Sequence, residues 1–200
     1  MAAKLLFASS NSGKLKEFRA LALGTPLSLE LELFSEFDAI PPFEESASTF
    51  AENSLGKALH YSRDTDEFVL ADDSGLVVPS LDGRPGVHSA RYSGANATSE
   101  ERIAKLLQEM KDKTGSDREA HFVCALSLVR KEQAVAVITA LTDGIILECA
   151  HGKGGFGYDP VFYFPPLQRT FAELTAEEKN RHSHRGKAFR RMLAALPDVL

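Results

Sequence analysis

The sequence predicts an α/β protein built on a mixed β-sheet, and two observations carry this prediction. Residues 4–8 form a short apolar run that leads through a polar loop into a helical pattern, which is typical of a βα unit with parallel strands. Residues 120–129 and 134–141 are apolar runs joined at residues 131–133, which predicts an antiparallel hairpin. Both kinds of pairing in one chain indicate a mixed sheet. We expect a single domain over residues 1–200, with two lobes.

The composition fits an ordinary globular protein and argues against one class of partner. Of the 200 residues, 44% are hydrophobic, and the formal net charge is -5. Proteins that coat nucleic acid are strongly basic, so we expect no nucleic-acid polymer as a partner. A small polyanionic substrate would need locally placed lysines and arginines.

No segment of the sequence predicts a membrane partner or export. The apolar run at residues 4–8 is too short for a signal-peptide core, and no later stretch approaches the ~18 apolar residues of a membrane span. We therefore expect a cytoplasmic protein. Cys124 and Cys149 stand singly within apolar segments, so we expect both thiols to be buried, with neither a disulfide nor a zinc site.

The loop after the first strand carries residues suited to an anion. Helical spacing of apolar residues begins after Ser12 and ends at Gly24, so Lys14 stands in the first helical turn. Backbone N–H groups and the helix dipole favour anions at that position. A Walker A loop is excluded, because Ala8 replaces its first glycine and Leu15 its final hydroxyl residue. The loop is therefore either a helix cap or a phosphate-binding loop.

The central part of the chain predicts a strand, a loop and a helix. Residues 28–34 alternate between apolar and polar and predict a half-exposed strand. An acidic loop broken by prolines follows at residues 38–45. Thr49 with Glu52 is a capping-box pattern, which predicts a helix running to about Arg63.

The most unusual stretch is Asp72-Asp73-Ser74-Gly75, which stands between two apolar runs. Aspartate is a poor strand former, and an unpaired buried charge is costly. One interpretation is that the carboxylates interrupt the strand as a polar turn, because Asp, Ser and Gly dominate turns. The other is that they face a partner, such as a divalent cation, a water to be deprotonated or a basic side chain.

The second half of the chain predicts a loop, a helix and the hairpin. Residues 79–94 are dense in turn formers and form a long irregular segment, which is typical of a functional loop. Thr98 with Glu101 predicts another capped helix. After the hairpin strands, we expect a turn at residues 142–144 and a third antiparallel strand at residues 145–150.

Two polar segments near the end of the chain are suited to ligand binding. Residues 152–160 contain four glycines and two aromatic residues, so the rings either stack on a planar base or fill the core. Ser183 is a natural N-cap, which places His184 and Arg185 in the first turn of the last helix. Basic residues there oppose the helix dipole, which suggests another use for them.

Six groups of residues, in this order, resemble the inosine triphosphate pyrophosphatase family, which hydrolyses non-standard purine nucleoside triphosphates. The resemblance covers nearly the whole chain. Any one group is weak evidence, but six in order are highly specific. The groups are Ser9-Ser10-Asn11-x-x-Lys14; Glu45 with Thr49-Phe50-x-Glu52-Asn53 and Lys57; Ala71-Asp72-Asp73-Ser74-Gly75-Leu76; Pro85-Gly86-Val87-x-Ser89-Ala90-Arg91-Tyr92; Gly154-Gly155-Phe156-Gly157-Tyr158-Asp159-Pro160; and Glu178-Lys179 with Ser183-His184-Arg185-Gly186.

The resemblance implies a two-lobed fold on a long mixed sheet flanked by helices, with the active cleft between the lobes. It also implies a homodimer that uses magnesium (Mg²⁺) to cleave substrates such as ITP, dITP and XTP. The products are the nucleoside monophosphate and pyrophosphate, so such an enzyme removes these nucleotides from the pool.

By position, the resemblance also implies roles for individual residues. Glu45 and Asp73 would bind magnesium, and Asp73 would accept the proton of the attacking water. Asp72 is its acidic neighbour and could be a second ligand. The residues expected to hold the triphosphate and the nucleoside are Ser9, Ser10, Asn11, Ser12, Gly13, Lys14, Lys57, Ser74, Phe156, Gly157, Tyr158, Asp159, Lys179, His184 and Arg185.

The sequence departs from the family pattern at two places. Ser9 and Ser10 stand where Thr-Gly is common, which adds a side chain near the phosphates, and His88 stands where an aromatic residue is usual. Two other functions remain open at this point. One is a nucleotide sensor that binds without turnover, and the other is a related pyrophosphatase acting on pyrimidine or modified nucleotides.

Overall fold

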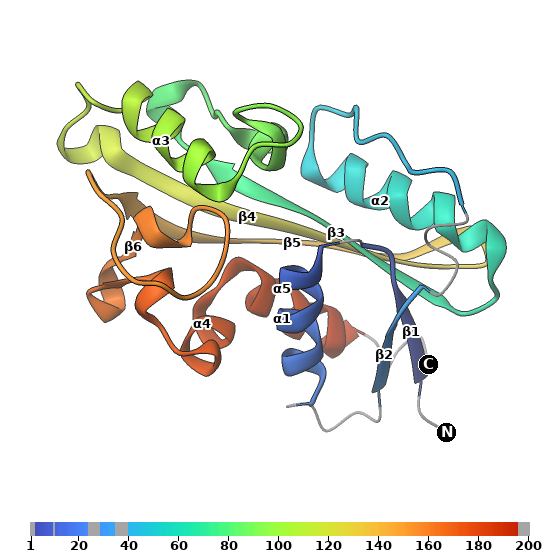
Figure 1. Ribbon diagram of the computed structural model, residues 1–200. Coiled ribbons are helices and arrows are strands. Elements are labelled where there is room, and N and C mark those ends of the chain that lie inside the picture. The colour runs from blue at the N-terminus through green and yellow to red at the C-terminus, as the bar shows by residue number, and fades with distance from the viewer. Residues whose placement is uncertain (1–2, 10, 24–28, 35–39, 196–200) are drawn as a thin grey trace. The chain divides into compact units, whose positions relative to one another are not determined.

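A computed structural model describes residues 3–9, 11–23, 29–34 and 40–195, and its described strands form one mixed sheet (Figure 1). The strand order is β2-β1-β3-β4-β5-β6-β7. The strands are β1 (Ala3–Phe7), β2 (Leu29–Leu33), β3 (Phe68–Val77), β4 (Glu119–Arg130), β5 (Gln133–Ile146), β6 (Phe162–Phe164) and β7 (Arg169–Thr170). The α-helices are α1 (Ser12–Leu23), α2 (Phe50–Tyr61), α3 (Ser99–Glu109), α4 (Ala176–His182) and α5 (His184–Ala195).

The chain divides into two compact units. Unit 1 consists of Met1–Asp73, Cys124–Ala140 and His184–Leu200, and unit 2 of Ser74–Val123 and Leu141–Ser183. Strands β3, β4 and β5 each have residues in both units. The mixed α/β sheet predicted from the sequence is confirmed, whereas the cleft between lobes stays a prediction.

Unit 1 contains parallel strands, of which β1 and the first part of β3 are largely buried. Strand β1 pairs in parallel with β2 and with β3. Phe7 and Leu70 belong to one core cluster, which α1 and α5 cover, whereas Val69 and Ala71 belong to a second cluster with α2. Figure 1 shows α2 on one side of these strands and α1 with α5 on the other. Because side chains alternate along a strand, each face of β3 serves a different core.

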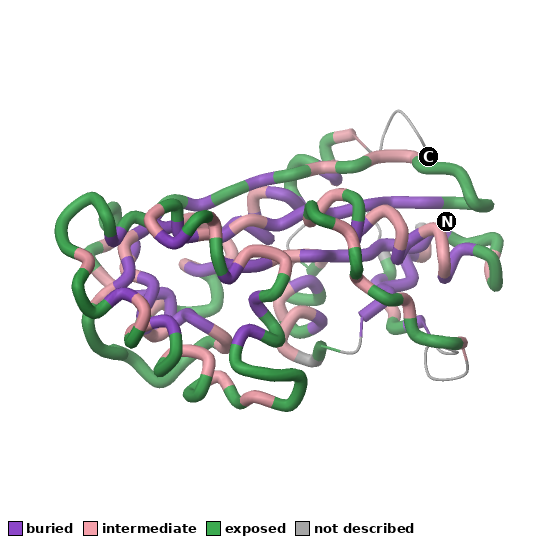
Figure 2. The backbone as a smooth tube through the Cα atoms, turned by 90° about the horizontal axis from the view of Figure 1, so that it is seen from above, coloured by how far each residue is buried: buried purple, intermediate pink, exposed green. Residues whose placement is uncertain are grey.

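Unit 2 has a separate core rich in aromatic side chains. Phe162 of β6 packs against Phe122 of β4 and against Phe171, with ring centroids 4.4 and 4.9 Å apart. Helix α3 begins at the predicted capping box, in which the Thr98 side chain and the Glu101 side chain each bind the other residue's backbone. In Figure 2 long stretches of the backbone are buried, whereas many of the loops are exposed.

Two predicted turns are absent, because the strands run straight through them. Strand β3 is continuous across Asp72-Asp73-Ser74-Gly75, so the interpretation of this stretch as a turn is wrong. Strand β5 is continuous to Ile146, so neither the turn at residues 142–144 nor a separate strand at residues 145–150 forms. A Cβ atom on Gly144 would lie 2.4 Å from the Phe162 ring, so this glycine allows close packing rather than a turn.

Other local predictions hold with small shifts. Lys131 and Glu132 form a two-residue connection between β4 and β5, both with positive φ (50° and 57°), which is the geometry of a tight antiparallel hairpin.

Helix α4, which begins at a capping box of Thr175 and Glu178, was not predicted. Cys124 is buried as expected, but Cys149 is exposed, so that prediction is wrong. No helix in the described part of the chain is long and apolar enough to cross a bilayer.

A buried arginine ties the end of α3 to β5 within unit 2. The Arg118 side chain is 8% exposed and donates to four backbone carbonyls. Its Nε–H bonds the carbonyl of Ile146 at 2.6 Å, and its Nη2–H bonds that of Leu147 at 2.8 Å. The Nη1 group donates to the carbonyls of Met110 and Lys113. The guanidinium therefore satisfies acceptors that the ends of these elements leave open.

Replacing Arg118 by glutamine should lower the free energy of unfolding by about 2–5 kcal/mol, because several buried carbonyls lose a charged donor. The matched control is Arg63→Gln, since Arg63 lies 3.5 Å from Glu132 with both side chains more than 60% exposed. That exposed pair should contribute less than about 1 kcal/mol. Urea denaturation of the two variants measures the difference, and equal losses would refute the structural role of Arg118.

Candidate functional site

The twin aspartates lie at the carboxyl end of the parallel strands in unit 1. Strand β1 ends at Phe7, and the next residue, Ala8, donates its N–H to the carbonyl of Leu70 at 2.9 Å. Strand β3 continues beyond this last contact, so Asp72 and Asp73 follow directly after the parallel pairing. Open α/β sheets bind ligands at the carboxyl ends of their strands, which makes this edge the candidate site.

The loop between β1 and α1 is a helix cap. The side chain of Asn11 accepts a hydrogen bond from the Lys14 N–H at 3.1 Å, and the Ser9 hydroxyl accepts one from the Asn11 N–H at 3.2 Å. The capping interpretation is therefore confirmed for Asn11, and phosphate binding by this loop stays a prediction. Ser10 and the side chain of Ser12 lie outside the described residues.

Asp72 is fully buried and is surrounded by donors. Lys14 forms an ion pair with its Oδ1 atom, and Arg185 Nε lies 3.8 Å from its Oδ2 atom. The thiol of Cys124 donates to Oδ2 at 3.1 Å. Burial acts to raise the pKa of Asp72, but the charges of Lys14 and Arg185 outweigh it and hold that pKa well below its ordinary value. Asp72 is thus a charged carboxylate inside the protein.

Arg185 lies between two carboxylates. Besides its approach to Asp72, its Nη1 group donates to Glu17 Oε2 at 3.0 Å. The Arg185 side chain is 8% exposed and that of Glu17 is 13% exposed. These contacts link α5 to α1 and assign Arg185 to the surroundings of Asp72. His184, its neighbour in the first turn of α5, is also buried.

Asp73 points to the opposite face of β3, toward α2. The side-chain amide of Asn53 donates to Asp73 Oδ2 at 3.1 Å, and Asn53 also accepts a bond from the N–H of Ala47 at 2.9 Å. Glu45 forms an ion pair with the buried Lys57. Burial, together with the nearby negative charge of Glu45, raises the pKa of Asp73 to about 6. The negative charges of Asp73 and Glu45 therefore repel one another.

Magnesium binding by Glu45 and Asp73, which the resemblance implies, stays a prediction, and the chemistry of the two carboxylates is compatible with it. Burial and then the charge of Glu45 raise the pKa of Asp73, and a divalent cation relieves such repulsion between two carboxylates. Among the described residues, no three His, Cys, Asp or Glu side chains group closely enough to hold a metal by themselves. Magnesium suits a site of this kind, since it usually takes one or two carboxylates together with substrate phosphates and water.

The predicted nucleoside residues of unit 2 are joined through Asp159. Its Oδ2 atom accepts the Phe156 N–H at 2.7 Å and the Lys179 ammonium at 2.5 Å. Lys179 Nζ also lies 4.8 Å from the centroid of the Phe156 ring. Gly155 has φ of +69°, and a Cβ atom there would come within 2.1 Å of Asp159 Oδ2. The glycine is therefore needed for this contact.

The two aromatic residues of the glycine-rich loop have different surroundings. The Tyr158 ring is 4% exposed and belongs to the core of unit 2, where its hydroxyl donates to the carbonyl of Ser89 at 3.0 Å. Phe156 is only half-buried. Filling the core is thus the role of the Tyr158 ring, whereas stacking on a base stays a prediction for Phe156. Ser74 and Gly157 are half-buried residues of the same unit.

The structure brings the predicted residues together in two sets. In unit 1 they meet at the carboxyl end of β3 and form a set that we name the aspartate cluster, which consists of Lys14, Glu45, Lys57, Asp72, Asp73 and Arg185. In unit 2, Phe156, Asp159 and Lys179 form a set that we name the lysine–phenylalanine cluster. No role for Cys124 or Glu17 is apparent from the sequence, since nothing in the spacing of either residue marks it as a partner of β3 or α5.

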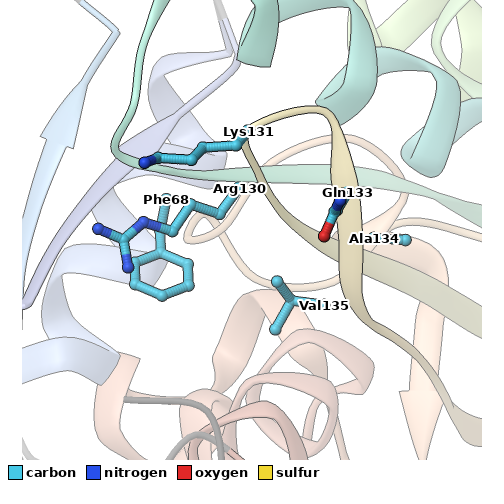
Figure 3. A pocket seen from close by; sticks show the side chains of 6 residues that line it. All are labelled: Phe68, Arg130, Lys131, Gln133, Ala134 and Val135. Carbon is cyan, nitrogen blue, oxygen red and sulfur yellow. The ribbon is translucent and has the colours of Figure 1, made fainter.

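A pocket of about 320 Å³ lies apart from these predicted residues, beside the β4–β5 hairpin (Figure 3). The Arg130 guanidinium lies 4.7 Å from the centroid of the Phe68 ring, and its Nε–H bonds the carbonyl of Asp66. The pocket is lined by Phe68, Arg130, Lys131, Gln133, Ala134 and Val135. None of these residues was predicted to bind substrate or metal.

Comparison with known proteins places the chain among relatives of nearly equal length. Residues 5–195 match the model of the Ham1 family. The chain is 46% identical over 189 residues to a dITP/XTP pyrophosphatase of Geobacillus kaustophilus, covering 94% of this chain and 92% of the relative. It is 45% identical over 196 residues to a dITP/XTP pyrophosphatase of Thermus thermophilus, covering 98% and 92%.

Solved structures show the same fold. A HAM1 protein from Coxiella burnetii superposes with a TM-score of 0.87 at 41% identity, covering 98% of this chain and 99% of that one. The Ham1 protein of Staphylococcus aureus gives a TM-score of 0.86 at 36% identity, covering 98% and 100%. The family resemblance found in the six groups of residues is confirmed, and the chain belongs to the Ham1 family.

Proposed function

We propose that this protein is a nucleoside triphosphate pyrophosphatase that hydrolyses non-standard purine nucleotides (ITP, dITP and XTP) to the monophosphate and pyrophosphate. The observation that carries the proposal is the aspartate cluster, in which Lys14 of the first helix reaches Asp72 at the carboxyl end of the parallel strands. The relatives named dITP/XTP pyrophosphatase support the substrate class.

The aspartate cluster supplies the charges that phosphoryl transfer needs. Positioning and charge neutralisation, rather than covalent chemistry, carry most of the catalysis in this class of reaction. Lys14 and Lys57 each stand in an ion pair with a carboxylate, which holds the two ammonium groups in place before substrate binds. Both lysines then offset part of the roughly four negative charges of a nucleoside triphosphate.

We assign Asp73 as the proton acceptor. Asn53 binds its Oδ2 atom and so fixes the orientation of the carboxylate, which leaves Oδ1 to orient a water and to take its proton. The water attacks the α-phosphorus, and pyrophosphate leaves. Glu45 and Asp73 would hold Mg²⁺, which when bound neutralises phosphate charge and polarises the phosphoryl oxygens.

We assign the nucleoside to the lysine–phenylalanine cluster. Phe156 offers a ring for stacking on the base, and Asp159 holds Lys179 beside that ring. Hypoxanthine and xanthine present an acceptor at O6, where adenine presents an amino donor. Protein donors facing this position would pair with O6 and stay unpaired against adenine, a penalty of ~1–3 kcal/mol for each lost bond.

The proposed function also implies a cellular compartment and an oligomeric state. Nucleoside triphosphates are cytoplasmic metabolites, so an enzyme that removes aberrant ones belongs in that compartment. We also propose a homodimer as the working form. Neither a nucleic-acid polymer nor a membrane is needed for this activity.

Replacing Asp73 by asparagine should abolish pyrophosphate release from ITP in the presence of magnesium, because the amide cannot accept the proton. We expect a loss of at least ~100-fold in kcat, within the usual effect of a positioned general base. Circular dichroism should show an unchanged fold. The control is Asp66→Asn, an exposed carboxylate of the same unit, which should retain full activity. Retained turnover in Asp73→Asn would refute the role, and tight ITP binding by an inactive wild-type protein would identify a sensor.

Replacing Phe156 by alanine should lower kcat/KM for ITP and XTP about 5- to 150-fold, since base stacking contributes ~1–3 kcal/mol. The control is Tyr163→Ala, a half-buried aromatic residue on β6 in the same unit. A panel of purine and pyrimidine triphosphates assayed with both variants measures the effect. Equal activity of Phe156→Ala and wild type, or a preference of the wild type for pyrimidines, would contradict the assignment.

A further inference from the structure

Cys124 is a buried polar contact of the aspartate cluster to which the proposed mechanism gives no role. It lies in the part of β4 that belongs to unit 1 and is completely buried. Its thiol donates to Asp72 Oδ2 at 3.1 Å. It also belongs to the core cluster that includes Phe7 and Leu70, and the charges of Arg185 and Lys14 are near enough to act on the thiol. A hydrogen bond from the core thus reaches a buried carboxylate.

The thiol remains a donor at neutral pH. Burial, followed by the negative charge of Asp72, raises the pKa of Cys124 well above its ordinary value. The group is therefore an S–H, and its one hydrogen points to a charged acceptor.

The contacts of Asp72 are divided between its two oxygen atoms. Oδ1 binds Lys14, while Oδ2 accepts the Cys124 thiol and faces Arg185 Nε. The last torsion of an aspartate side chain is soft, so a carboxylate with few partners can rotate. Contacts on Oδ2 fix the plane of the group and thereby the direction in which Oδ1 meets Lys14.

We propose that Cys124 is a positioning residue for the triphosphate, acting through Asp72 to hold the Lys14 ammonium in place. The inference rests on the proposed function, because Lys14 is assigned there to the phosphates. Cys124 itself touches neither the substrate nor the reacting atoms in this scheme. Loss of the thiol hydrogen bond should therefore weaken triphosphate binding more than it slows the chemical step.

If Cys124 only filled space in the core, the relative effects of alanine and serine at this position would be reversed. If Cys124 only fills space, alanine should be tolerated better than serine, because serine brings a hydroxyl into an apolar site. If its hydrogen bond positions Asp72, serine should be tolerated better than alanine, because a hydroxyl can donate in place of the thiol. The order of the two variants therefore separates the two roles.

The experiment measures KM and kcat for ITP with magnesium in the variants Cys124→Ala and Cys124→Ser. We expect alanine to raise KM about 3- to 10-fold, with kcat within about twofold, and serine to keep KM within about twofold of wild type. The control is Ser127→Ala on the same strand, where a buried hydroxyl has no hydrogen-bond partner among the described residues. This control should leave KM unchanged.

A spectroscopic readout tests the hydrogen bond directly. The chain has two cysteines, so in a Cys149→Ser background the S–H stretching band in the infrared belongs to Cys124 alone. We expect this band at a lower frequency than that of an unbonded thiol, because donation weakens the S–H bond. A band at the unbonded frequency would overturn the inference.

The outcomes distinguish this inference from the proposed function. A wild-type protein that hydrolyses none of the triphosphates overturns the proposed function and the inference with it. An active wild type whose Cys124→Ala variant keeps its KM overturns only the inference. The same holds if alanine and serine raise KM equally, or if alanine is the better tolerated of the two.

Discussion

The structure of unit 1 depends on compensating a carboxylate that is fully removed from water. An isolated charge in such a place is far too costly to keep, so Asp72 requires partners that carry positive charge. Lys14 from α1 and Arg185 from α5 provide it, and Glu17 in turn binds Arg185. Two helices distant in sequence are thereby fixed against the same strand. The cost of burying Asp72 is offset by this network, whose Lys14 we assign to the substrate phosphates.

The alternation of side chains along β3 gives the adjacent aspartates different surroundings. Asp72 faces the side of α1 and α5 and keeps a depressed pKa, whereas Asp73 faces α2, where burial and Glu45 raise its pKa. Environments that separate the pKa values of neighbouring acids are typical of sites with distinct acid–base roles. One uninterrupted strand therefore holds two adjacent carboxylates with opposite pKa shifts, and the proposed function assigns proton transfer to Asp73 alone.

The sequence predicted features that local chemistry determines and missed those that depend on distant partners. The capping box at Thr98, the start of α1 and the mixed sheet follow from local patterns. Of the two interpretations of the aspartates, the turn is wrong and a basic partner is confirmed for Asp72, but the sequence could not name Lys14 and Arg185 because both are remote along the chain. Gly144 was likewise assigned to a turn, whereas it makes room for the Phe162 ring. The carbonyl contacts of Arg118 and the thiol contact of Cys124 are also tertiary.

The central claim is that the buried pair of Lys14 and Asp72 holds this edge of the sheet together. A double-mutant cycle on the free energy of unfolding, with Lys14→Met, Asp72→Asn and the combined variant, tests it most directly. Each single change removes one member of the pair, so the account predicts a coupling energy of at least about 2 kcal/mol, with the double variant less destabilised than the sum. Losses that add within about 0.5 kcal/mol would contradict it.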